Sequence, residues 1–266
     1  MSIQFITLIS QFCGFAAVDA IYLNNALSQY LRQQRIAWQR TMNVGKIKLT
    51  KLNRKDALRY MGYGTREPDS QTFALLDKCE KELLRTIDGK YVYRVFPLVY
   101  GQIPDSEFYL EGNSIKNHLS GCSEAIFLCA TLSDAVDRLI RVKQISSMAE
   151  AVVVDALASA AVEQVCDFAE NEIMHNFPAF EHTWRFGLGY GDFPLEGQSK
   201  FLDILEAPKR IGVCVSKSLL LTPTKSVTCI IGLGHDLSKE RIKSCDMCSL
   251  GGHCTFRLNG GTCQSR

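Results

Sequence analysis

A glycine-rich segment is the part of the chain whose residues are best suited to bind a small molecule. Glycine recurs at every second position, at Gly187, Gly189 and Gly191, so backbone N–H and C=O groups are open to a planar heterocycle without an intervening Cβ. Arg185 opens the segment, and its guanidinium can bind a carboxylate through two hydrogen bonds. A dinucleotide-binding fingerprint is excluded because Asp192 stands where the third glycine belongs. On composition alone, a tight surface turn is the alternative.

A second candidate is Glu163, which lies in an alanine-rich helical pattern that runs from about Ser147 to His175. On a period of 3.6 residues, Glu163 shares one helix face with Ala156, Ser159, Ala160, Cys166 and Asp167. The small side chains on this face would let an ammonium group of a ligand approach the carboxylate. A solvated glutamate on a helix surface is the alternative.

Four cysteines near the end of the chain form a third candidate site. They are Cys245, Cys248, Cys254 and Cys263. A Cys-x-x-Cys pair can hold one ion between two thiolates, and four sulfur ligands complete a zinc site or an iron–sulfur cluster. The second pair of a zinc ribbon is missing, so disulfides and free thiols are the alternatives. The five histidines have no ligand spacing, and no Ser/His/Asp or Cys/His set can be identified.

The elements that must position these residues follow from hydrophobic periodicity. Helices are predicted at residues 53–61, 70–87, 113–119, 147–175 and 198–205. Strands are predicted just after Met42 and at residues 91–100, 125–131, 210–215 and 226–232. The longest helix has a predicted buried stripe of Val153, Leu157, Ala160, Ala161, Val165 and Phe168. Because strands and helices do not alternate regularly, the pattern favours an α+β fold.

Composition limits the classes of partner. The chain has 266 residues, 46% of them hydrophobic, which is enough for a substantial core, and a net charge of +2 without a basic run, so nucleic acid is not an expected partner. The seven cysteines outside the tail are scattered singly and are predicted to be mostly buried in a cytoplasmic, reducing environment. The first 18 residues are uncharged, but Gln4, Ser10 and Gln11 interrupt them and Asp19 follows, which argues against a membrane span.

Four segments, in the same order and at similar spacing, resemble the activation domain of cobalamin-dependent methionine synthase. They are Asp155–Glu163, Arg185–Pro194, Arg210–Val213 with Ser216 and Ser218, and Pro223–Val227. The likeness is strongest to stand-alone proteins of this type from anaerobes and covers roughly residues 42–234. It implies a twisted, mostly antiparallel sheet with flanking helices. The predicted division is an N-terminal extension at 1–41, or an artefact of the assigned start, an S-adenosylmethionine-binding domain at 42–240, and a cysteine-rich tail at 241–266.

The resemblance also implies roles for single residues. Arg185 matches the arginine that binds the methionyl carboxylate, and Glu163 matches the glutamate near the amino group of the ligand. Gly187 matches the small residue whose backbone meets the adenine, and Gly189 and Tyr190 belong to the same binding loop. The aspartate near the start of the family domain and the tyrosine after its last strand have no counterpart.

The implied function is reductive methylation of a corrinoid that a partner protein carries. The partner would be a methionine synthase or another corrinoid protein, with a flavodoxin or ferredoxin as electron donor. The chain would orient S-adenosylmethionine without a catalytic acid, base or nucleophile of its own and without independent turnover. The alternatives are a redox protein whose tail cluster reduces a corrinoid protein directly, and a zinc-stabilised interaction protein that retains the fold without the ligand.

Overall fold

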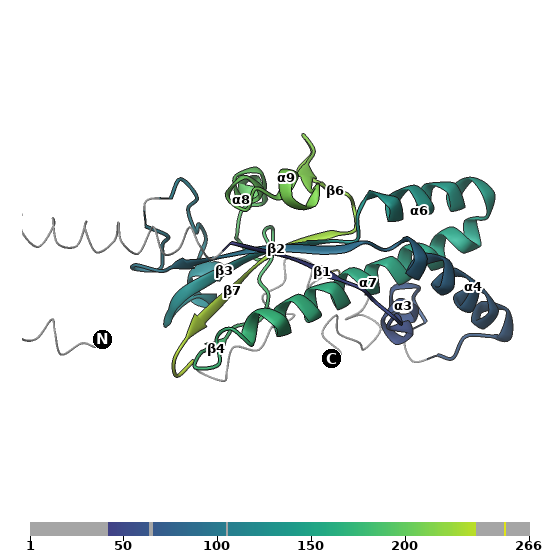
Figure 1. Cartoon of the computed structure of the whole chain (residues 1–266), viewed down its shortest axis with the longest axis horizontal. Coiled ribbons are helices and arrows are strands. Elements are labelled where there is room, and N and C mark those ends of the chain that lie inside the picture. The colour runs from purple at the N-terminus through teal and green to yellow at the C-terminus, as the bar shows by residue number, and fades with distance from the viewer. Residues whose placement is uncertain (1–41, 64–65, 105, 238–252, 254–266) are drawn as a thin grey trace, which may run out of the picture. The chain divides into compact units, whose positions relative to one another are not determined.

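The computed structural model describes residues 42–63, 66–104, 106–237 and 253 of the chain (Figure 1). They belong to a unit that runs from Met42 to Arg266. The predictions for residues 1–41 and for the four tail cysteines lie outside the described residues, and the predicted domain division stays a prediction. Within the described ranges, no helix has both the length and the apolar character needed to cross a membrane.

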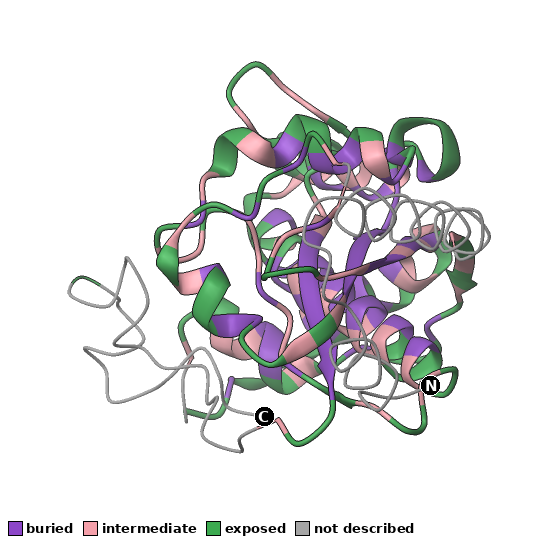
Figure 2. Cartoon of the chain, turned by 90° about the vertical axis from the view of Figure 1, so that its left-hand side faces the viewer, coloured by how far each residue is buried: buried purple, intermediate pink, exposed green. Residues whose placement is uncertain are grey.

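An antiparallel sheet occupies the centre of the described residues. Its strand order is β1-β2-β3-β7-β4, and the strands are β1 (Asn43–Ile47), β2 (Gly89–Pro97), β3 (Cys122–Thr131), β7 (Ser226–Gly234) and β4 (Glu181–His182). Cys129 on β3 pairs with Val92 on one side and with Thr228 on the other. Burial is concentrated in β2, β3 and β7 (Figure 2), because both faces of the sheet are covered there, whereas the edge strands β1 and β4 contain no buried residue. The structure confirms the predicted α+β fold with a mostly antiparallel sheet.

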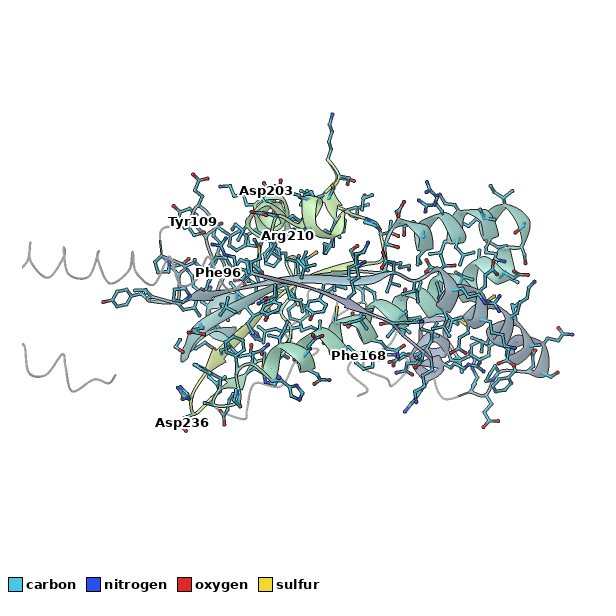
Figure 3. The ribbon with its side chains drawn as sticks, in the orientation of Figure 1. Phe96, Tyr109, Phe168, Asp203, Arg210 and Asp236 are labelled. Atoms are coloured by element: carbon cyan, nitrogen blue, oxygen red, sulfur yellow. The ribbon has the colours of Figure 1, made fainter. Side chains whose placement is uncertain are left out.

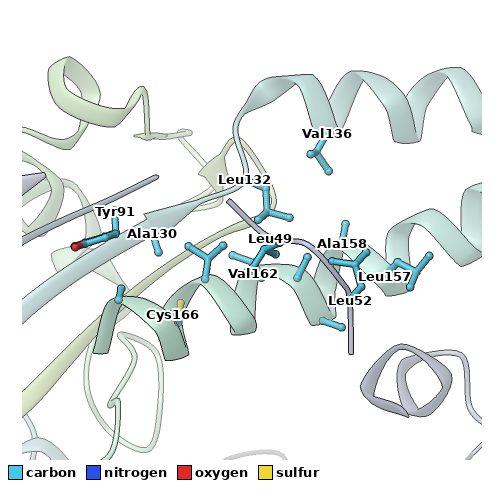
Figure 4. Close-up of a cluster of buried hydrophobic side chains, with 14 of the residues drawn as sticks. Leu49, Leu52, Tyr91, Ala130, Leu132, Val136, Leu157, Ala158, Val162 and Cys166 are labelled. Carbon is cyan, nitrogen blue, oxygen red and sulfur yellow. The ribbon is translucent and has the colours of Figure 1, made fainter. Parts of the chain in front are cut away.

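One face of the sheet is covered by the long helix α7 (Met148–Met174). The side chain of Ser147 accepts a hydrogen bond from the Glu150 N–H group and caps the start of the helix. Small buried residues such as Ala158 (Figure 4) allow close packing against the strands and neighbouring helices. The other helices packed around α7 are α3 (Arg54–Tyr60), α4 (Ser70–Thr86) and α6 (Asp134–Ser146).

The opposite face carries an aromatic core. Phe127 on β3 stacks on Phe201, with ring centroids 4.7 Å apart, and meets Phe96 and Phe108 edge to face. Phe201 belongs to α8 (Gln198–Ile204), which follows a 3₁₀ turn, η1 (Leu195–Gly197). The other helices on this side are α5 (Asn113–His118) and α9 (Ala207–Ile211). This packing holds the segments that carry the glycine-rich loop.

Two predictions about single segments are wrong. Residues 210–215 are predicted as a strand, but α9 occupies the first two of them and ends at Gly212, which has a φ of +74°. Extended pairing is restricted to β5 (Cys214–Val215), which pairs with β6 (Leu221–Thr222). Phe168 is predicted to be buried, but it lies on the outer side of α7 and is 53% exposed (Figure 3).

Candidate functional site

Arg185 lies just beyond β4, and its guanidinium binds three carboxylates on α7. Its Nη1 atom is 2.9 Å from Asp167 Oδ1 and 2.6 Å from Glu170 Oε2. Its Nη2 atom is 3.1 Å from Glu163 Oε2. Spacings of four and three residues place the three carboxylates on one face of the helix. The side chain of Arg185 is only 16% exposed, so its guanidinium is shielded from water on most sides, whereas the side chains of Glu163 and Asp167 are 35% and 36% exposed.

The Arg185 cluster, made of Arg185, Glu163, Asp167 and Glu170, has more negative than positive charge. Three carboxylates face one guanidinium, and His182 Nε2 lies 3.3 Å from Glu170 Oε1. Burial raises the pKa of Glu170, but the hydrogen bond from His182 and the charge of Arg185 outweigh burial, so this pKa lies below its ordinary value. The excess negative charge of the cluster therefore favours the approach of a positively charged group to this face of α7.

The structure brings together the two side chains that the sequence assigns to the two ends of an amino-acid headgroup. Arg185 and Glu163 lie in direct contact, across a distance of 3.1 Å. A headgroup bound between them would have to replace this ion pair with its own carboxylate and ammonium. The roles of the two residues in binding stay predictions. Glu170 and His182 are additional members of this site that the sequence analysis missed. Glu170 could have been found, because its spacing of seven residues from Glu163 places these two glutamates on one helix face.

The glycine-rich loop begins directly after Arg185 and turns back on itself. Gly189 has a φ of +81° and Gly191 a φ of +60°, a region that residues with a Cβ rarely adopt. The Gly189 N–H group donates to the Phe193 carbonyl at 2.9 Å, and the Tyr190 N–H group donates to the Gly187 carbonyl at 3.3 Å. The turn therefore requires glycine at positions 189 and 191, and its internal hydrogen bonds give the loop a defined shape.

Asp192 fixes this loop to the start of α5. Its carboxylate accepts hydrogen bonds from the N–H groups of Asn113, at 2.7 Å, and Ser114, at 2.8 Å. These hydrogen bonds from Ser114 and Asn113 lower the pKa of the Asp192 carboxyl. A Cβ on Gly112 would lie 2.6 Å from the Asp192 carbonyl oxygen, so the two backbones approach too closely for any other residue. The sequence analysis did not identify this contact, which joins residues far apart in the chain.

Tyr190 anchors the loop on its other side. Its ring meets Trp184 and Phe186 edge to face, with centroids 5.4 Å and 5.2 Å away. His118 extends this group, because its ring packs on Trp184 and its Nε2 atom lies 2.7 Å from Thr183 Oγ1. The half-buried Tyr190 is therefore part of the support of the loop. Its predicted contact with a ligand stays a prediction.

The cysteines near the site are buried thiols. Cys166 on α7 and Cys229 on β7 are buried, and burial raises the pKa of both thiols well above the ordinary value. Both are neutral at physiological pH and poorly suited to nucleophilic chemistry. The described part of the chain contains no group of three or more His, Cys, Asp or Glu side chains placed to hold a metal ion. The metal site predicted at the four tail cysteines stays a prediction.

Comparison with known proteins identifies a solved structure with a similar fold. No protein-family model matches the chain, and no curated protein matches it. The structure is similar to the crystal structure of the MetH reactivation domain bound to AdoHcy, with a TM-score of 0.57 at 14% sequence identity. The match covers 83% of this chain and 86% of that domain. The chain thus has a fold like that of the reactivation domain over most of its length.

Proposed function

We propose that this chain binds S-adenosylmethionine and supports the reductive reactivation of the corrinoid in a cobalamin-dependent methionine synthase or a related methyltransferase. The observation that carries the proposal is the Arg185 cluster, which places the arginine and the glutamate implied by the sequence resemblance side by side. The reactivation-domain fold supports it, because a protein with this fold has been crystallised with AdoHcy.

The charges of the cluster fit an amino-acid headgroup. The carboxylate of the ligand would replace Glu163 at the Arg185 guanidinium, which offers a planar pair of N–H donors. The ligand ammonium would bind the released Glu163 carboxylate, while Asp167 and Glu170 continue to orient Arg185. The remaining negative charge on α7 would attract the positively charged sulfonium of S-adenosylmethionine. Two opposite charges on the ligand thus meet two opposite charges on the protein.

The residues of this chain would act by orientation. S-adenosylmethionine supplies a methyl group that is already activated by its positively charged sulfur. Arg185 and Glu163 would fix the amino-acid end of the molecule, and the backbone of Gly187 and Gly189 would receive the planar adenine. The corrinoid that accepts the methyl group would be carried by a partner protein, and the electron would come from a flavodoxin or ferredoxin. The chain would then have no turnover of its own.

Isothermal titration calorimetry with S-adenosylmethionine tests this function. We expect the wild-type chain to bind and Arg185→Ala to lose about 2 kcal/mol, or roughly thirtyfold in affinity, because an arginine–carboxylate pair is removed. The matched control is Arg210→Ala. Arg210 lies on α9, where its Nη2 atom pairs with Glu206 Oε2 at 2.9 Å, and its removal should leave the affinity unchanged.

Because Arg185→Ala leaves three carboxylates close together without their cation, its fold needs its own measurement. Circular dichroism and urea denaturation would show whether the variant remains folded. Arg185→Lys keeps the positive charge and loses the planar pair of donors, so we expect an intermediate affinity. A folded wild-type chain that binds no S-adenosylmethionine contradicts the proposal.

A further inference from the structure

Gln198 is a buried amide beside the glycine-rich loop that has no part in the site described so far. It opens α8, and only 2% of the residue is exposed. Its Nε2 atom donates a hydrogen bond to Thr228 Oγ1 at 2.8 Å. No group in the described ranges of the chain hydrogen-bonds its Oε1 atom. Buried polar atoms in folded proteins almost always have a partner, so this acceptor points to a donor that the described residues do not supply.

The Gln198 amide borders the part of the loop that follows Arg185. A Cβ on Gly197 would lie 3.5 Å from the Leu188 side chain, so the residue before Gln198 packs directly against the loop. A Cβ on Gly187 would lie 3.6 Å from the Thr228 carbonyl oxygen. Thr228, the hydrogen-bond partner of Gln198, is therefore also the neighbour of Gly187.

The edge of β7 adds backbone hydrogen-bonding groups at the same place. Phe186 and Ile230 exchange two hydrogen bonds, of 2.9 Å and 2.8 Å, on the outer side of β7. In an antiparallel strand, alternate residues direct their N–H and C=O groups to the same side. Thr228, two residues before Ile230, therefore directs its backbone groups to the side where the loop leaves the strand at Gly187. A planar ligand edge can meet a peptide group and a side-chain amide there.

Packing holds this amide in place. Phe201, in the first turn of α8, is fully buried and stacks on Phe127 of the central strand with an angle of 9° between the rings. Phe108 joins α8 to the loop, since its ring meets Phe201 of α8 and Phe193 of the loop edge to face, with centroids 5.9 Å and 6.3 Å away. The Oε1 atom is thus preorganised, as expected for a group that reads a ligand.

We infer that Gln198 is a specificity-determining residue of the S-adenosylmethionine site, and that its Oε1 atom accepts a hydrogen bond from the exocyclic amino group of adenine. The inference rests on the proposed function. The hydrogen-bond donors of the ligand are its ammonium, its ribose hydroxyls and the adenine amino group. The carboxylates on α7 attract the ammonium, and a buried amide next to a Cβ-free loop and a strand edge fits the planar base best. Gln198 thereby selects a 6-aminopurine over a 6-oxopurine.

Calorimetry with two ligands tests this role. S-adenosylhomocysteine and S-inosylhomocysteine differ at position 6 of the purine, where the second has an oxygen in place of the amino group. We expect the wild-type chain to bind the adenosyl ligand about tenfold more tightly, the effect of about one net hydrogen bond. Gln198→Met removes the acceptor at similar length. It should lower the affinity for the adenosyl ligand about tenfold and abolish the preference.

The free energy of unfolding of the variant provides the control for structure. Gln198→Met should be about as stable as the wild type, because the removal of a buried acceptor without a partner offsets the loss of the hydrogen bond to Thr228 Oγ1. Gln144→Met, an exposed glutamine of α6, should change neither affinity nor preference. Equal binding of both ligands by the wild-type chain overturns the role of Gln198, whether or not the variant folds, and would leave the ribose hydroxyls as the donors. A folded wild-type chain that binds neither ligand overturns the proposed function itself.

Discussion

The two faces of the central sheet contribute to the candidate site in different ways. On one face, the charged groups Glu163, Asp167 and Glu170 come from a single helix, α7, and converge on Arg185. On the other face, aromatic packing around Phe127 joins β3 to α8 and to the segments that hold the glycine-rich loop. The geometry of the charges therefore follows from local helix periodicity, whereas the position of the loop depends on contacts between distant parts of the chain.

The largest effect that tests this comparison is on stability. Phe127→Ala should lower the free energy of unfolding by about 3–5 kcal/mol, because it leaves a cavity among packed rings. Phe168→Ala makes the same change at an exposed position on α7 and should lower the free energy of unfolding by no more than about 0.5 kcal/mol. Urea denaturation measures both values. Equal losses would mean that the aromatic face is not the main support of the fold.

The second effect concerns the charged face. Glu163→Gln should weaken the binding of S-adenosylmethionine about tenfold or more, because the ligand ammonium loses a charged acceptor. Asp155→Asn is the matched control on the same helix, where Asp155 pairs with Lys225 at 2.8 Å, and it should bind like the wild type. Calorimetry at low and at moderate salt would measure both. A similar loss in both variants would indicate a general effect of charge on α7.

A smaller effect is expected in the pH dependence of stability. The folded chain holds the pKa of Glu170 below its ordinary value of 4.5, which means that folding favours the ionised carboxylate. This contribution is fully present above the pKa of the unfolded chain and is lost as the pH falls through the lower pKa of the folded chain. Glu170→Gln should therefore flatten the fall in stability below about pH 5.

The matched control for this pH dependence is Asp134→Asn. Asp134 forms an exposed ion pair with Arg138 on α6, and such pairs contribute little to stability. Urea denaturation at several pH values between 3 and 7 compares the three proteins. If Glu170→Gln follows the same pH curve as the wild type, the Arg185 cluster does not stabilise the ionised carboxylate.

The smallest effect should come from the support of the loop. Asp192→Ala removes the acceptor that holds the loop to the N–H groups of Asn113 and Ser114, so the affinity for S-adenosylmethionine should fall a few-fold. Asp203→Ala, at an exposed position on α8, should not change it (Figure 3). Calorimetry of the two variants gives the comparison. An unchanged affinity for Asp192→Ala would show that the loop holds its shape without this anchor.

Most of the fold could be predicted where the sequence pattern is long and regular. The run that becomes α7 lacks glycine and proline, and its observed limits, Met148–Met174, differ from the prediction by one residue at each end. The apolar run of β3 was predicted for the same reason. Residues 210–215 alternate like a strand, but Pro208 in the first turn and Gly212 at the end allow the short helix α9. Phe168 was misplaced because periodicity does not show how wide the covered face of a helix is.

The site could be predicted only in part, for a related physical reason. Arg185 and Glu163 belong to motifs that can be recognised in the sequence, and the structure places the two side chains in contact. Asp192 and Gln198 act through tertiary contacts, with α5 and with β7, and no local pattern in the sequence distinguishes them from the other polar residues of the chain. The sequence gives a weak indication of Glu170, because this residue lies on the same helix face as Glu163. Its contact with Arg185, however, depends on where the segment after β4 lies against α7.

A crystal structure of the chain with S-adenosylhomocysteine tests the central claim most directly. We predict that the ligand carboxylate binds Arg185, that the ligand ammonium binds Glu163, and that the two side chains separate beyond the 3.1 Å of their direct contact. Asp167 and Glu170 should remain on the guanidinium. A complex in which the Arg185–Glu163 ion pair is intact and the ligand lies elsewhere on the molecule would contradict the account.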